Sequence, residues 1–148
     1  MRPVNQFAVR PEAGHLPGQY QYLSTLLSPP EIAPDMWEHM QLLAQYACDA
    51  GFVVIFEDPD SFEKGPYWLL FSHEFKLLDE GALAVMYDGD ETTRIALVDE
   101  AIEFDWFNRR WRLSVRAKPG WHVFDMGTLF LPVLRKRWFV LKRVKRTP

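Results

Sequence analysis

Short apolar runs, each bounded by turn-forming residues, follow one another from residue 52 onward and restrict the chain to a strand-rich fold. Three of these runs stand out: Phe52–Phe56, Trp68–Phe71 and Ala82–Tyr87. Runs of about four to eight apolar and β-branched residues between Gly, Pro and Asp clusters are typical of strands. Residues 94–100 fit a helix or a strand. The tail from Arg135 to Arg146 fits a helix opened by Pro132 or a strand around Trp138–Leu141, and its β-favouring Trp-Phe-Val-Leu run favours the strand. We therefore expect residues 52–146 to be mainly strands.

The strongest long-range prediction is a β-hairpin over residues 102–116 with Asn108-Arg109 as its turn. Three apolar pairs then share one face: Trp106 with Trp111, Phe104 with Leu113 and Ile102 with Val115. On the other face Asp105 would lie opposite Arg112, an opposite-charge pair that stabilises a hairpin. After this hairpin, Pro119-Gly120 predicts another turn.

Residues 36–50 have a different period and predict a helix. Asp35 is a good N-cap, and Glu38 three residues later completes a capping box. Apolar residues then recur at a spacing of three to four, and Gly51 is a typical stop. The apolar positions are Met36, Met40, Leu43, Ala44 and Ala47.

Residues 1–30 contain five prolines, which disfavour regular structure. Because Phe7, Tyr20 and Tyr22 interrupt this polar segment, we expect an extended arm that lies on the domain. The whole pattern predicts a single α+β domain over residues 1–148. One N-terminal amphipathic helix would pack on a mostly antiparallel, twisted sheet of hairpins.

Charge is sorted along the chain. Residues 1–106 contain five Lys/Arg and nineteen Asp/Glu, a net charge of −14. Residues 107–148 contain twelve Lys/Arg and the single acid Asp125, a net charge of +11. Such asymmetry indicates either an anionic partner or two segments that neutralise each other.

The basic C-terminal segment supports the leading functional hypothesis, binding to nucleic acid or a nucleoprotein. Positive side chains displace counterions from phosphates, and aromatic rings stack on bases. The candidate residues are Arg135, Lys136, Arg137, Trp138, Lys142, Arg143, Lys145 and Arg146. The competing interpretation is that Arg112 and its neighbours pair with acids of adjacent strands.

The acidic loops support an alternative, a protein-binding adaptor or inhibitor whose carboxylates imitate phosphates. The candidate residues are Glu57, Asp58, Asp88, Asp90 and Glu91. These acids fall where Gly and Pro mark turns, so they also fit loops that are charged for solubility.

A second alternative is enzymatic. Pro59-Asp60 followed by Glu74-Phe75-Lys76 resembles the PD-(D/E)xK motif of nucleases, over about eighteen residues. The resemblance implies that Asp60 and Glu74 would hold a divalent ion and that Lys76 would assist hydrolysis. The histidines lack ligand spacing, so the leading interpretation remains a non-catalytic binding protein without a metal or cofactor.

Three features predict a soluble cytoplasmic protein. Cys48 is the only cysteine, which excludes an internal disulfide. The first ten residues lack the basic and apolar pattern of a signal peptide. The apolar runs are too short to span a bilayer.

Overall fold

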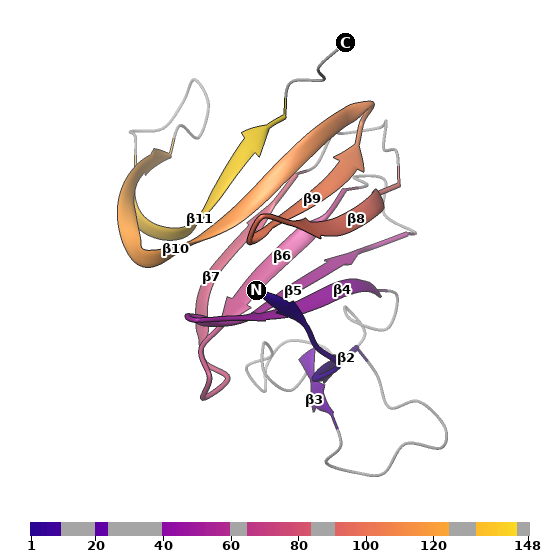
Figure 1. Cartoon of the computed structure of the whole chain (residues 1–148). Coiled ribbons are helices and arrows are strands. Elements are labelled where there is room, and N and C mark those ends of the chain that lie inside the picture. Colours follow the sequence, from indigo (N-terminus) through magenta and orange to yellow (C-terminus); the bar gives the residue numbers. More distant parts are fainter. Residues whose placement is uncertain (10–19, 24–39, 60–64, 84–90, 125–132, 145–148) are drawn as a thin grey trace.

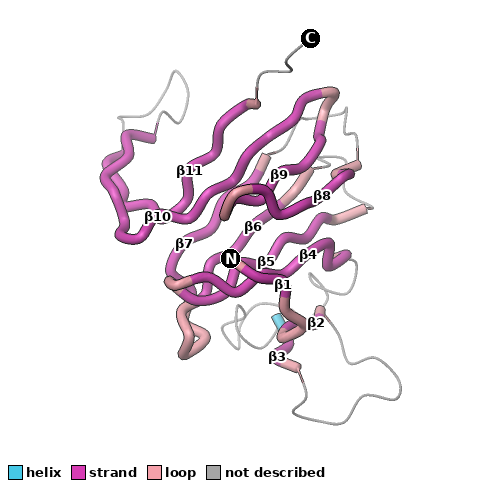
Figure 2. Tube along the Cα trace, in the orientation of Figure 1, coloured by secondary structure: helices cyan, strands magenta, loops and turns pink. Residues whose placement is uncertain are grey.

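In a computed structural model of the chain, residues 1–9, 20–23, 40–59, 65–83, 91–124 and 133–144 are described. Their secondary-structure elements are strands throughout, as Figure 2 shows for the two large sheets. These sheets stack face to face, and a small pair of strands lies beyond the larger sheet (Figure 1). The predicted α+β class is therefore wrong, because the described fold is built from β-sheets.

The larger sheet has five strands in the order β1-β4-β5-β6-β7, and all of its neighbours are antiparallel. Its strands are β1 (Arg2–Pro3), β4 (Gln41–Cys48), β5 (Gly51–Glu57), β6 (Tyr67–Phe71) and β7 (Leu77–Ala82). The predicted runs 52–56 and 68–71 are confirmed as β5 and β6. The strand predicted to begin at Ala82 is wrong at that end, because β7 ends at Ala82. Residues 84–87 of this predicted strand lie outside the described residues.

The second sheet has four strands in the antiparallel order β11-β10-β9-β8. They are β8 (Thr93–Val98), β9 (Ala101–Trp106), β10 (Arg109–Phe124) and β11 (Val133–Arg143). Strand β10 is long, and only Arg109–Leu113 pair with β9. Beyond Leu113, β10 pairs with β11 alone, and the two curve away from the rest of the sheet (Figure 1).

The main hydrophobic core lies between the two sheets. The larger sheet contributes Tyr46, Val53, Ile55, Trp68 and Leu70, and the smaller one Ile102, Phe104, Trp106, Leu113 and Phe139. Because successive side chains of a strand point to opposite faces, each strand presents alternate residues to this core. The aromatic richness of the sequence is thus used largely for packing.

A second core covers the outer face of the larger sheet. Strands β2 (Phe7–Ala8) and β3 (Gln21–Tyr22) pair in parallel, and Phe7 and Leu23 are fully buried there. They pack on Val54, Phe56, Leu69 and Phe71. The described parts of the N-terminal arm therefore lie on the domain, as predicted. Burial on both faces also explains why β5 and β6 read as unbroken apolar runs.

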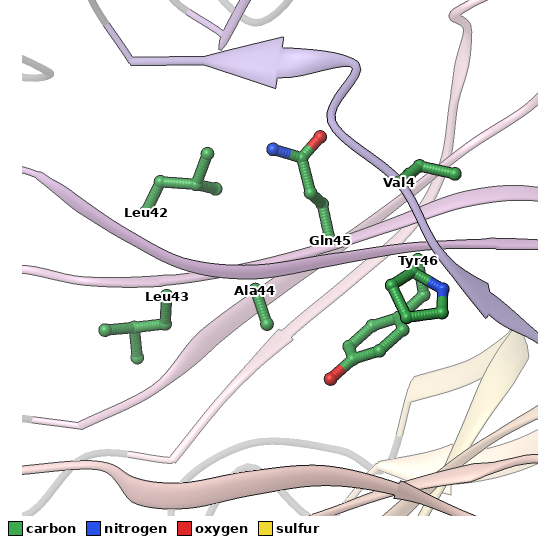
Figure 3. A pocket seen from close by; sticks show the side chains of 7 residues that line it. Val4, Leu42, Leu43, Ala44, Gln45 and Tyr46 are labelled. Atoms are coloured by element: carbon green, nitrogen blue, oxygen red, sulfur yellow. The ribbon is translucent and has the colours of Figure 1, made fainter.

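The helix predicted over residues 36–50 is wrong, because residues 41–48 form β4; residues 36–39 lie outside the described residues. The register of β4 against β5 is irregular between Leu42 and Ala44. Leu42 and Gln45 point toward the N-terminal arm, whereas Leu43, Ala44 and Tyr46 point to the opposite side (Figure 3). A β-bulge thus places the consecutive residues Leu43 and Ala44 on one face. The resulting spacing of apolar residues resembles that of an amphipathic helix.

Hydrogen bonds between the Gln45 side chain and the N-terminal arm stabilise residues 41–48 as a strand. Its Oε1 accepts hydrogen bonds from the backbone N–H of Gln6 at 2.6 Å and of Phe7 at 2.8 Å. Its Nε2 donates to the carbonyl oxygen of Phe7 at 3.1 Å. An extended β4 with Gln45 facing the arm satisfies these backbone groups, and tertiary contacts of this kind override helix propensity.

The hairpin predicted at 102–116 is confirmed as β9–β10, but its register differs by two residues. The turn is Phe107-Asn108, whose φ values of 51° and 55° are those of a type I′ turn. Trp111 pairs with Phe104 and Leu113 with Ile102. A two-residue shift keeps every side chain on its predicted face, because the strand period is two.

The shift does change the charge pair: Asp105 lies opposite Arg110, and the predicted Asp105–Arg112 pairing is wrong. The turn predicted at Pro119-Gly120 is also wrong. Strand β10 continues through these residues with an irregular register between Val115 and Gly120. The ambiguous segment 94–100 contributes strand β8, and β11 includes the strand expected around Trp138–Leu141.

Candidate nucleic-acid interface

Acidic residues of β9 neutralise Arg110 and Arg112 of β10. Arg110 Nε lies 2.8 Å from Glu103 Oε2, and Arg110 Nη1 lies 3.1 Å from Asp105 Oδ1. Arg112 Nη1 lies 2.8 Å from Glu103 Oε1. Arg94 adds a longer contact, 3.6 Å from Nη1 to Asp105 Oδ2. This part of the sheet is zwitterionic, as the competing interpretation of the sequence predicted.

The hydrogen bond from Arg110, reinforced by that from Arg112, holds the pKa of Glu103 below its ordinary value of 4.5, although burial opposes the shift. The same hydrogen bond to Glu103 raises the pKa of the Arg110 guanidinium. Both directions favour the charged forms. These arginines are therefore engaged inside the fold.

Arg137 and Trp138 are engaged by β7. Asp79 is 1% exposed, and its Oδ1 lies 3.0 Å from Arg137 Nη1. Its Oδ2 accepts the backbone N–H groups of Trp138 at 2.7 Å and Phe139 at 3.1 Å. The Trp138 side chain is half-buried against the main core. One carboxylate thus joins the edges of the two sheets, and these two candidate residues contribute to structure.

Arg109 is exposed at the start of β10, and the remaining basic residues of the two strands lie on β10 beyond Leu113 and on β11. We name residues 114–124 and 133–143 the basic ribbon. Its sequence contains no Asp or Glu. Lys118, Lys136, Lys142 and Arg143 are exposed, and Arg116 is half-buried. None of these five side chains takes part in the ion pairs found between described residues. The four exposed side chains therefore present their charge to solvent.

Trp121 is the functional candidate that sequence reasoning missed. Its side chain is 63% exposed, and Lys136 Nζ lies 5.1 Å from the ring centroid. The two residues are direct cross-strand partners. The predicted turn at Pro119-Gly120 would separate Trp121 from the basic strands, and for this reason the pairing of Trp121 with Lys136 was not predicted from the sequence. The available signal was the presence of an aromatic residue within a few positions of Arg116 and Lys118.

The other predicted basic residues are only partly placed. Arg135 pairs with His122 in the backbone register of the basic ribbon. Lys145 and Arg146 lie outside the described residues. Lys142 lies opposite Arg112, so the basic ribbon continues the zwitterionic part of the sheet.

The acidic candidates differ in exposure. Glu57 is buried and accepts the backbone N–H of Thr92 at 3.1 Å, so it supports the fold. Asp58 is half-buried, and Glu91 is exposed. Asp88 and Asp90 lie outside the described residues. The described acids therefore do not form one exposed surface.

The residues of the nuclease-like motif are also only partly placed. Glu74 and Lys76 are exposed in the turn between β6 and β7, and Asp60 lies outside the described residues. Ser72 Oγ donates to Glu74 Oε2 at 2.8 Å, which lowers the pKa of Glu74. Among the described residues, no group of three His, Cys, Asp or Glu side chains could hold a metal ion.

No protein family matches the sequence, and no curated protein or solved structure resembles it significantly. Within the described part of the chain, none of the structure is a helix that could cross a membrane. We therefore infer a function from the charge and shape of the basic ribbon.

Proposed function

We propose that this protein is a non-catalytic nucleic-acid-binding protein whose binding surface is the basic ribbon. The observation that supports the proposal is the distribution of charge. Five basic side chains of an acid-free strand pair have no ion-pair partner among the described residues, while Arg110, Arg112 and Arg137 are engaged by acids. Such a surface fits a polyanion, because each phosphate contact releases condensed counterions.

The shape of the basic ribbon supports the same proposal. Beyond Leu113 it is two strands wide, a width that fits along a nucleic-acid strand or in a major groove. Lys136 and Lys142 of β11 are both exposed, and Leu141, the neighbour of Lys142, packs against the core. Six residues of extended chain separate the two lysines, about 20 Å. Several phosphates of one strand could be contacted along that length.

A net charge of −3 does not oppose this proposal, because the binding potential depends on the local surface. A cytoplasmic location belongs to the same proposal. It rests on Cys48, the only cysteine, whose thiol pKa is raised by burial, so that the reactive thiolate is disfavoured.

The test is a pair of charge-reversal variants. Lys118→Glu/Lys142→Glu changes two exposed residues of the basic ribbon. Arg2→Glu/Lys76→Glu changes two exposed residues outside it, one in β1 and one in the turn between β6 and β7. Both variants alter the net charge equally. We expect the first to weaken binding to generic DNA or RNA by about 100-fold or more in fluorescence anisotropy, because two phosphate contacts become repulsive. The control variant should bind within about threefold of the wild type.

Equal weakening by the two variants would show that only net charge matters and would overturn the assignment to the basic ribbon. Absence of binding by the wild-type protein at low salt would overturn the proposed function altogether.

A further inference from the structure

Trp121 is unusual among the aromatic residues described in the structure. It is 63% exposed, whereas Trp68 and Trp106 are 4% exposed in the main core. Among the described residues, the other large exposed hydrophobic side chain is Leu77, at 44%, on β7. An isolated exposed apolar residue needs no explanation. Trp121 is different because basic residues surround it, so an accessible indole ring lies within the proposed polyanion-binding surface.

The backbone holds Trp121 in a defined orientation. Trp121 pairs with Lys136, and its neighbour Gly120 pairs with Arg137, whose guanidinium faces the buried Asp79. Adjacent residues of a strand point to opposite faces. Trp121 therefore points away from β7 and toward solvent, on a strand that is hydrogen-bonded to its partner.

One cationic group lies over the ring. Lys136 Nζ lies 5.1 Å from the ring centroid, in a cation–π arrangement. The Arg116 guanidinium occupies the space that a Cβ would fill at Gly120, so it lies on the opposite face of the strand from Trp121. An exposed aromatic ring beside a positive group can stack on a base while the cation contacts a flanking phosphate.

We propose that the basic ribbon binds single-stranded nucleic acid, with an unpaired base stacked on Trp121 and a neighbouring phosphate contacted by Lys136. This inference rests on the proposed function and specifies its ligand. Bases within a duplex are already stacked on each other and offer no free face, whereas unpaired bases do. Stacking is tolerant of sequence because every base has a π-face, so both DNA and RNA strands fit.

The test compares affinities for an unstructured strand of about 16 nucleotides, as DNA and as RNA, and for the duplex of the same sequence. The proteins are the wild type, Trp121→Ala and Trp121→Phe. We expect Trp121→Ala to lose about tenfold in affinity for either single strand and to keep its affinity for the duplex. Trp121→Phe should retain most of the single-strand affinity, because it keeps an aromatic face.

Thermal unfolding of Trp121→Ala provides the control for folding, and we expect the wild-type midpoint because the ring is exposed. Equal losses for single strand and duplex, or no loss for either, would overturn the stacking inference while the proposed function stands. A wild-type protein that binds neither form would overturn both. A preference for RNA or DNA would identify which single strand is the ligand and would support the inference.

Discussion

At the scale of single residues, Glu103 shows how the fold uses charge. Each of its carboxylate oxygens accepts a hydrogen bond from a different arginine, Oε2 from Arg110 and Oε1 from Arg112. The side chain is only 10% exposed, so water competes weakly for these bonds. Charge-assisted hydrogen bonds of this length are stronger than neutral ones. Glu103 therefore fixes two residues that would otherwise extend the basic surface.

This arrangement predicts a pH dependence of stability. The pKa of Glu103 in the folded protein lies below its ordinary value of 4.5. The stabilisation is therefore fully present above pH 4.5 and is lost as the pH falls through the lower, folded-state pKa. We expect Glu103→Gln to be less stable than the wild type at neutral pH, and the difference to shrink in acid. Urea unfolding of both proteins across this range measures it, and a difference that is constant with pH would contradict it.

At the scale of elements, Asp79 joins β7 of one sheet to β11 of the other. Its side chain is 1% exposed and binds the Arg137 guanidinium and two backbone N–H groups of β11. Removing one partner of a buried ion pair leaves the other charge without compensation. The carboxylate therefore fixes the position of the basic ribbon relative to the larger sheet.

We expect Asp79→Ala to lower the free energy of unfolding by about 3–5 kcal/mol. The matched control is Glu91→Ala, which removes one exposed carboxylate and should change stability by less than about 0.5 kcal/mol. Chemical denaturation of the three proteins provides the comparison. If both variants unfolded at the same denaturant concentration, Asp79 would not join the sheets as described.

The elements also show which features sequence reasoning could predict. Alternation of apolar residues predicted the faces of β9 and β10, because a face depends only on the period of two. It did not predict their register, because the Phe107-Asn108 turn contains no glycine to mark it. The strand β4 was missed because its bulge imitates helical spacing. No local pattern shows that Gln45 faces the backbone of the arm.

The candidate site was predicted in part for similar reasons. The basic run of β11 is visible in the sequence, but the engagement of Arg137 by Asp79 joins residues 58 positions apart. Trp121 was missed because Pro119-Gly120 indicated a turn, whereas β10 passes through it. The positions of both side chains depend on pairing between distant strands.

At the scale of the whole molecule, folding removes part of the charge asymmetry of the sequence. Glu103 and Asp105 offset arginines of β10, and Asp79 offsets Arg137. The positive charge that remains is concentrated on the basic ribbon, at the edge of the sheet next to β7. The asymmetry therefore reflects pairing within the fold and, as we propose, a surface for a polyanion.

The salt dependence of binding tests this central claim most directly. The affinity of the wild-type protein for a single strand of about 16 nucleotides is measured at increasing salt concentration. Neutralisation of about five phosphates by the five basic side chains predicts a straight line of log affinity against log salt, with a slope of about −3.5. A slope near zero, or no binding even at low salt, would contradict the account.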